Sequence, residues 1–197
     1  MTQHADADTR RGQVASALVT VVAERGLART TLADVARTAG VSVGLVQRYF
    51  RSKDELLRFG IEYVYRRAEE RAAAVPVRLP IREFVVRLME MFLPMTDERG
   101  AELRVWLSFV QASLTDPGMA AIHRDTTARL LRGVEEALRG AQRAGELGAG
   151  VDVEAEAAAL VAFVDGLSLH HAATGDGFDA SSISAALAAY VDRLFGR

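Results

Sequence analysis

Apolar side chains recur every three or four residues along most of the chain, which is the period of amphipathic α-helices. The pattern predicts nine helices and no strand: residues 9–25, 31–39, 43–49, 53–74, 80–93, 98–114, 117–144, 153–173 and 182–195. Glycines at the ends of the predicted helices, such as Gly26 and Gly40, suit the positive φ that often terminates a helix. The sequence therefore predicts an all-α protein.

Two of the predicted helices are short and share one tight turn, within residues 31–49. Leu32 and Val35 begin the apolar face of the first helix, Gly40 ends it, and Ser42 is placed to cap the second. Helices joined so closely must cross steeply, and this geometry lets the second helix enter the major groove of DNA. The turn alone is also compatible with ordinary helix packing.

The second helix carries outward side chains of the kinds that read DNA. Gln47 can bond adenine through two hydrogen bonds, Arg48 can bond guanine or phosphate, and Leu45 can contact a thymine methyl. Gly44 weakens a helix by roughly 0.5–1 kcal/mol relative to alanine, so it indicates a close approach, either of the first helix or of DNA. These residues favour a DNA reader over a packing motif.

A third helix is predicted to begin at Lys53, because Ser52 and Glu55 have the Ser-x-x-Glu spacing of a capping box. A helix N-terminus offers free N–H groups to an anion, and Lys53, the only lysine in the chain, adds positive charge there. One interpretation is that Lys53 is only a solvent-exposed residue at the start of this helix, without a binding role. The position favours a contact with DNA phosphate.

The segment 30–57, with its Ala-Gly-Val-Ser turn, a glycine two residues on and the Tyr49-Phe50 pair, resembles the TetR family of bacterial regulators. The resemblance covers residues 10–57 and implies a nine-helix TetR-like fold, in which Tyr49 reaches phosphate and Phe50 fills the core. Gln47 stands where many members carry tyrosine. The predicted DNA-contacting residues are Thr31, Ser42, Val43, Gly44, Leu45, Gln47, Arg48, Tyr49 and Lys53.

The net charge of −2 is unusual for a nucleic-acid binder, but the charge is unevenly distributed. Residues 25–53 hold six basic side chains and one acid, a local charge of +5, which leaves −7 on the remainder. Such asymmetry favours one orientation of approach to DNA. Because a +5 patch is modest, tight binding is expected to need two copies of the chain.

Several other classes of protein are disfavoured. The chain has no cysteine, which excludes disulfides and cysteine-based zinc sites. His170 and His171 point about 100° apart on a helix, so no metal site is predicted, and no cofactor is expected. No serine or histidine has the motif context of a hydrolase, which disfavours an enzyme. We expect no apolar leader and no membrane span, and hence a cytoplasmic bacterial protein.

The domain division predicted from these patterns is a helix-turn-helix DNA-binding domain at 9–52 and an effector-binding and dimerisation domain at 53–197, connected by the helix at 53–74. The last two helices carry stripes of small and apolar residues that also suit a core. The TetR resemblance implies that these helices pair across a twofold axis in a homodimer. The predicted interface residues are Ala158, Ala162, Gly166, Ile183, Leu187, Tyr190 and Leu194.

The middle helices are rich in methionine and aromatic residues, which more often form core than a pocket. The segments 102–114 and 163–167 resemble the C-terminal domain of choline-responsive BetI-type regulators, and the family resemblance implies an effector cavity in this bundle. An aromatic cage there would suit a cationic ligand. The predicted lining residues are Tyr63, Phe84, Met91, Trp106, Phe109, Phe163 and His170.

The favoured function is a ligand-responsive repressor that binds a near-palindromic operator as a homodimer and is released by a small-molecule effector. Half-sites are then expected one helical turn of DNA apart, about 34–36 Å, or a multiple of it. The alternatives are an activator, an effector-independent DNA-binding protein, and an enzyme or carrier in which the reader-like segment only packs.

Overall fold

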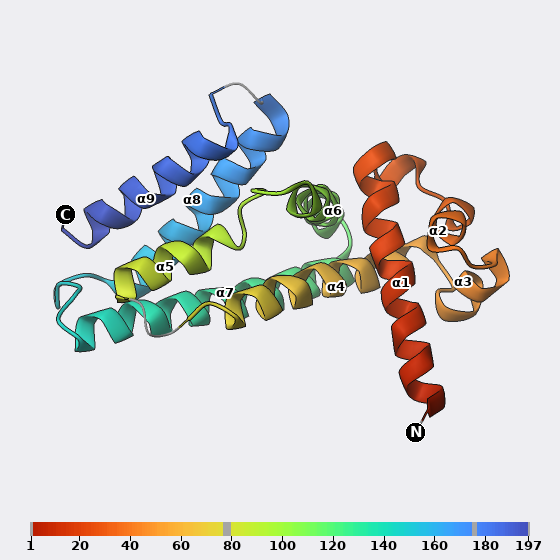
Figure 1. Cartoon of the computed structure of the whole chain (residues 1–197), viewed down its shortest axis with the longest axis horizontal. Helices are drawn as coiled ribbons and strands as arrows, with labels where there is room; N and C mark the ends of the chain where they lie inside the picture. The colour runs from red at the N-terminus through yellow and green to blue at the C-terminus, as the bar shows by residue number, and fades with distance from the viewer. Residues whose placement is uncertain (1, 77–79, 175–176, 197) are drawn as a thin grey trace. The chain divides into compact units, whose positions relative to one another are not determined.

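The computed structural model describes residues 2–76, 80–174 and 177–196. Within these residues it contains nine α-helices, one short 3-10 helix and no strand (Figure 1). The elements are α1 (Thr2–Arg25), η1 (Leu27–Arg29), α2 (Leu32–Ala39), α3 (Val43–Tyr49), α4 (Lys53–Ala73), α5 (Ile81–Glu90), α6 (Asp97–Ser113), α7 (Pro117–Arg143), α8 (Val153–Thr174) and α9 (Ala180–Leu194). The predicted all-α class is confirmed.

The helix boundaries follow the predicted ones closely, with α3 identical to its prediction. The largest difference is α1, which begins at Thr2 where the apolar pattern predicted a start near residue 9. The first buried apolar side chain of α1 is Val14 among the residues whose side chains are described. Helical hydrogen bonds continue beyond the apolar stripe, so periodicity alone underestimates the length of such a helix.

The chain forms two compact units: residues 1–67 with 100–121, and residues 68–99 with 122–197. Besides α1 to α3, with η1, the first unit therefore includes most of α4, most of α6 and the start of α7. Contacts with α4 explain this, because the Trp106 indole N–H donates to the Tyr65 hydroxyl at 3.1 Å. These units do not coincide with the functional division at residue 52, which stays a prediction.

The core of the first unit forms where α1 packs against α2, and α2 against α3. Val14, Leu18 and Val46 are fully buried there. A side chain at Gly60 of α4 would place its Cβ 2.4 Å from Leu18 Cδ2, so glycine is needed where Leu18 packs. Each such buried aliphatic side chain stabilises the fold by about 1.5–3 kcal/mol relative to an exposed one. These contacts join α2 to α1 and α3 to α2.

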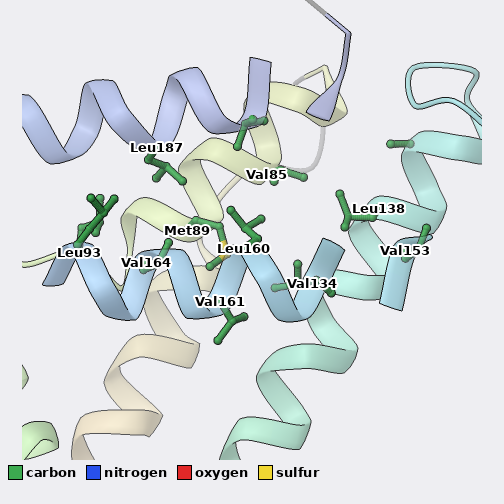
Figure 2. Packing of buried hydrophobic residues seen from close by; sticks show 14 of the residues in the cluster. Val85, Met89, Leu93, Val134, Leu138, Val153, Leu160, Val161, Val164 and Leu187 are labelled. Atoms are coloured by element: carbon green, nitrogen blue, oxygen red, sulfur yellow. The ribbon is translucent and has the colours of Figure 1, made fainter. Parts of the chain in front are cut away.

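The second unit has its own core, built from α5, α7, α8 and α9 (Figure 2). Met89, Leu138, Leu160 and Leu187 are almost fully buried in it, and Figure 2 shows Leu187 directed from α9 toward α5 and α8. By length and composition α8 would also suffice to cross a membrane, which the sequence pattern did not indicate. Its buried apolar residues belong to this core.

Candidate nucleic-acid interface

The start of α2 is fixed by a full capping box. The Thr31 hydroxyl accepts a hydrogen bond from the Asp34 N–H at 3.1 Å, and the Asp34 carboxylate accepts one from the Thr31 N–H at 3.3 Å. Asp34 also pairs with Arg25 of α1 and with Arg37. The hydrogen bond from the Thr31 hydroxyl lowers the pKa of Asp34, and both arginines add to this effect. Asp34 thus links α2 to the end of α1.

The turn between α2 and α3 has the predicted geometry. Gly40 lies in the left-handed region at φ 66°, and its N–H and that of Val41 donate back to α2. Ser42 then caps α3, since its hydroxyl oxygen accepts a hydrogen bond from the Leu45 N–H at 3.2 Å. The predicted roles of Gly40 and Ser42 in the turn are confirmed.

Helix α3, the second helix of the pair, has one buried side and one open side. Val46 is fully buried, and Phe50, which follows the helix, is 3% exposed, so the predicted core role of Phe50 is confirmed. The outward side consists of the exposed Val43, Gly44, Gln47 and Arg48 and the half-buried Leu45 and Tyr49. These side chains are available to a partner, as the pattern predicted. Their contact with DNA stays a prediction.

The structure separates the two explanations for Gly44. A Cβ at this position would meet no atom within 4 Å, so the glycine is not required by the packing of α3 on the rest of the chain. Gly44 is exposed and has negative φ, so no turn demands it either. Clearance for the first helix is therefore not the reason for this glycine, and the approach of DNA stays a prediction.

The N-terminus of α4 differs in detail from the predicted capping box. The Ser52 hydroxyl accepts from the Glu55 N–H at 3.1 Å, but the Glu55 carboxylate accepts from the Arg51 N–H at 2.7 Å. The Lys53 ammonium donates to the Ala28 carbonyl of η1 at 3.2 Å. An ammonium has three donors, so this hydrogen bond positions Lys53 without exhausting its capacity to bind phosphate.

The local sequence patterns do not predict the position of one residue beside this surface. The guanidinium carbon of Arg11, on α1, lies 5.5 Å from the centre of the Tyr49 ring. The two residues are far apart in sequence, and no local pattern connects them. The sequence feature that marks Arg11 is the pair of basic residues Arg10-Arg11, directly before the apolar stripe of α1.

The predicted effector-lining residues fall in both units. Trp106 bonds to Tyr65, Tyr63 lies under the guanidinium groups of Arg66 and Arg67, and Phe109 is fully buried, all in the first unit. The other four, in the second unit, are Phe84, Met91, Phe163 and His170.

Two of these residues stack on neighbours from the end of the chain. Phe163 stacks on Tyr190 at 4.9 Å, and His170 stacks on Phe178 at 4.8 Å. Their role in binding a ligand stays a prediction, because aromatic stacking of this kind also serves packing alone.

Asp165 and Ser168 of α8 are two polar residues that the sequence patterns do not predict as a site. Burial raises the pKa of Asp165 to about 6. The Ser168 hydroxyl is buried and has no hydrogen-bond partner in the described part of the chain. The residues are three apart and therefore lie on one side of the helix. In the sequence, the feature that distinguishes these two residues is that an acid and a serine interrupt an otherwise apolar helical stretch.

The predicted dimer interface needs a correction. Ile183 and Leu187 are fully buried within a single chain, against the core of their own unit, so neither side chain is available to a second copy. For Ile183 and Leu187 the core interpretation is right, and for the rest of the predicted interface the pairing with a second copy stays a prediction. Of the remaining predicted residues, Ala158 and Ala162 are exposed, and Gly166, Tyr190 and Leu194 are half-buried. The Tyr190 hydroxyl donates to Glu156 at 3.0 Å.

A capped pair of short helices, with the second one exposed, followed by a helical bundle, is the architecture of a helix-turn-helix transcriptional regulator. Residues 15–58 match the family model for bacterial regulatory proteins of the tetR family. Residues 81–196 match the model for the C-terminal part of BetI-type transcriptional repressors. The chain belongs to the TetR family, as the resemblance indicated.

Named relatives extend over most of the chain. The HTH-type transcriptional regulator PksA of Bacillus subtilis is 31% identical over 172 residues, which cover 86% of this chain and 82% of that protein. The HTH-type transcriptional regulator BetI of Paraburkholderia phymatum is 31% identical over 176 residues, covering 86% of this chain and 84% of that protein. Both relatives are named as HTH-type transcriptional regulators.

Solved structures share the fold. A transcriptional regulator from a Rhodococcus species has a TM-score of 0.84 at 28% identity, covering 94% of this chain and 96% of that one. A transcriptional regulator from Saccharomonospora viridis, solved in complex with choline, has a TM-score of 0.85 at 24% identity, covering 94% and 96%. At this identity the second comparison shows the fold alone.

Proposed function

We propose that this chain is a ligand-responsive transcriptional repressor that binds a near-palindromic operator as a homodimer and is released by a small-molecule effector. The observation that carries the DNA-binding part is the exposed, capped helix α3, whose opposite side is fixed by the buried Val46. The match of residues 81–196 to a repressor family supports repression over activation.

In this proposal α3 enters the major groove and α2 crosses the DNA backbone. Gln47 and Arg48, exposed at the centre and end of α3, contact base edges. Tyr49 and Lys53 contact phosphates, and the α4 N-terminus adds its free N–H groups. Phosphate contacts position the protein, whereas the base contacts select the sequence.

The second copy is proposed to dock on the outer side of α8. Ala158 and Ala162 are exposed there, Gly166 is half-buried, and Leu169 is 47% exposed, which is unusual for leucine. Small residues let a second helix approach closely, and the leucine adds apolar area. Isologous pairing of this surface produces a twofold dimer with two recognition helices.

Effector recognition is assigned to the second unit, at Asp165 and Ser168 of α8. Asp165 is half-buried, and the Ser168 hydroxyl is buried without a hydrogen-bond partner among the described residues. A ligand that pairs with this carboxylate and this hydroxyl would offset their desolvation and stabilise the fold. Desolvation alone shifts the pKa of Asp165, with no contribution from a positively charged neighbour. A small organic cation would supply the positive charge that pairs with the ionised carboxylate. The fold neighbour solved with choline, itself an organic cation, supports this class of ligand. Tyr63, Trp106 and Phe109 remain predictions from the sequence.

The DNA-binding part is tested by selecting duplexes from a random-sequence pool with the purified protein and mapping the footprint. We expect a site with twofold symmetry, and a variant Gln47→Ala that loses about 1–3 kcal/mol at particular base pairs. Failure to enrich any sequence, or an unchanged preference in the variant, would reject the placement of α3.

The effector part is tested separately, with choline as the probe on the selected duplex. A ligand must bind the two states of the protein with different affinities to release DNA. We therefore expect choline to weaken the footprint of the parent, and to do so less with Asp165→Asn. A footprint that choline leaves intact, while choline demonstrably binds, would reject release by this ligand.

A further inference from the structure

The contact between Arg11 and Tyr49 joins α1 to the end of the recognition helix α3. The Arg11 guanidinium carbon lies 5.5 Å from the centre of the Tyr49 ring, within the range of a cation–π interaction. Arg11 is exposed and Tyr49 is half-buried, so both can reach a partner from solvent. Arg11 lies outside the helix-turn-helix, whose two helices are α2 and α3.

Each of the two residues has buried neighbours in its own helix or directly after it, which fix the position of its backbone. In α1, Val14 and Ala15 are fully buried one turn after Arg11. Tyr49 is followed directly by Phe50, which is 3% exposed and lies 5.2 Å from Phe59 between ring centres. The relative position of Arg11 and Tyr49 is therefore set by the core of the first unit.

The polar ends of the pair are not engaged inside the protein. Among the described residues, neither the Arg11 guanidinium nor the Tyr49 hydroxyl makes a hydrogen bond or an ion pair. A guanidinium that lies over a ring still has N–H donors at its edge, and a phenol hydroxyl is a further donor. Adjacent donors with one positive charge match the oxygens of a phosphate.

We propose that Arg11 and Tyr49 together bind one phosphate of the DNA backbone. Arg11 contacts the phosphate and also positions the Tyr49 ring, so α1 extends the interface beyond the helix-turn-helix. This inference rests on the proposed DNA binding, and it adds a contact that is independent of base sequence. In this proposal Arg11 of α1 binds DNA, in addition to the role of α1 in the core of the first unit.

The test measures the salt dependence of binding to a duplex that the parent protein selects from a random pool. For Arg11→Ala we expect the slope of log K against log salt to fall in magnitude by about 0.9 for each bound protomer. Arg11→Lys keeps the charge and is expected to keep the slope, but to bind less tightly because it lacks the planar group. Arg132→Ala, an exposed arginine of α7, is the control for charge loss alone.

A double-mutant cycle then tests whether the two residues act together. Tyr49→Phe should weaken binding in the parent and have little effect in Arg11→Ala, because one phosphate contact has already been lost. Thermal unfolding of each variant confirms that the fold is retained. Equal slopes for Arg11→Ala and Arg132→Ala, or additive effects in the cycle, would overturn the proposal. If the parent protein selects no duplex, the proposed DNA binding itself is rejected. That result differs from a parent that binds DNA without a contribution from Arg11 and Tyr49, which would reject only the present inference.

Discussion

Arg58 of α4 and Asp116 form an ion pair at 3.0 Å within the first unit. Asp116 also caps α7, since its carboxylate accepts a hydrogen bond from the Met119 N–H at 2.7 Å. That backbone hydrogen bond lowers the pKa of Asp116, and Arg58 adds to the effect. A side chain at Gly118 would place its Cβ 2.5 Å from both terminal nitrogens of Arg58. The glycine therefore leaves the space that the ion pair occupies.

Gly118→Ala is expected to displace the Arg58 guanidinium and to break the ion pair while the fold and the cap survive, because a flexible side-chain end can move. The lost pair then offsets the gain in helix propensity that alanine brings. Gly133→Ala in the same helix is the matched control, because its Cβ would meet nothing within 4 Å. The control should raise the free energy of unfolding by roughly 0.5–1 kcal/mol.

The measurement is denaturant unfolding of both variants in the parent and in Arg58→Ala. Gly118→Ala should be less stable than Gly133→Ala in the parent, and the difference should disappear once Arg58 is removed. A difference that persists in Arg58→Ala would show that Gly118 is needed for another reason.

Gly44→Ala is expected to stabilise the protein and to weaken DNA binding. The added methyl group meets no atom of the chain, so alanine should raise the free energy of unfolding by roughly 0.5–1 kcal/mol. The same methyl group lies on the side of α3 that is proposed to face the major groove. Unfolding curves and binding isotherms on one preparation measure both effects, and tighter or unchanged DNA binding would contradict the proposed approach of DNA to Gly44.

Features that depend on neighbouring residues could be predicted from the sequence, and features that join distant residues could not. The bounds of α3, the positive φ of Gly40 and the cap at Ser42 follow from local spacing. The contacts of Lys53 with Ala28 and of Arg58 with Asp116 join residues 25 and 58 positions apart, for which no local pattern exists.

The α9 stripe shows a second limit of prediction from sequence. Ile183 and Leu187 lie on one apolar side of the helix, as predicted, but the pattern does not reveal which surface that side contacts. A helix that packs on its own core and one that packs on a second copy both bury the same kinds of residue. The burial of these two side chains within one chain decides between them.

This correction changes the substitutions that test the dimer. Ala162→Arg adds charge to an exposed position of α8 and is expected to yield a folded monomer with weaker operator binding. Leu187→Asp instead buries a carboxylate in the core, so it is expected to unfold the protein. Ala121→Arg, at an exposed position of α7, controls for the added charge. Sedimentation equilibrium measures the result, and an unaltered dimer in Ala162→Arg would exclude this side of α8 from the interface.

Asp165 gives the stability of the chain a predictable dependence on pH. Burial raises its pKa from the ordinary value of 3.8 to about 6, so the folded chain holds this proton more tightly than the unfolded chain does. Below about pH 4 both states are protonated, and the group has no net effect on stability. Between about pH 4 and pH 6 the unfolded chain loses this proton while the folded chain keeps it, so the free energy of unfolding falls across this range and levels off above it.

Asp165→Asn removes this ionisation and keeps the size of the side chain. We expect the variant to be more stable than the parent at pH 8, and the advantage to shrink as the pH falls toward 4, because the protonated parent then resembles the amide. Urea unfolding at a series of pH values measures the difference, with Glu62→Gln, an exposed acid of α4, as the control for loss of one negative charge. An advantage of equal size at pH 4 and pH 8 would show that the amide stabilises the fold by packing or hydrogen bonding, and that the buried charge is not the cause.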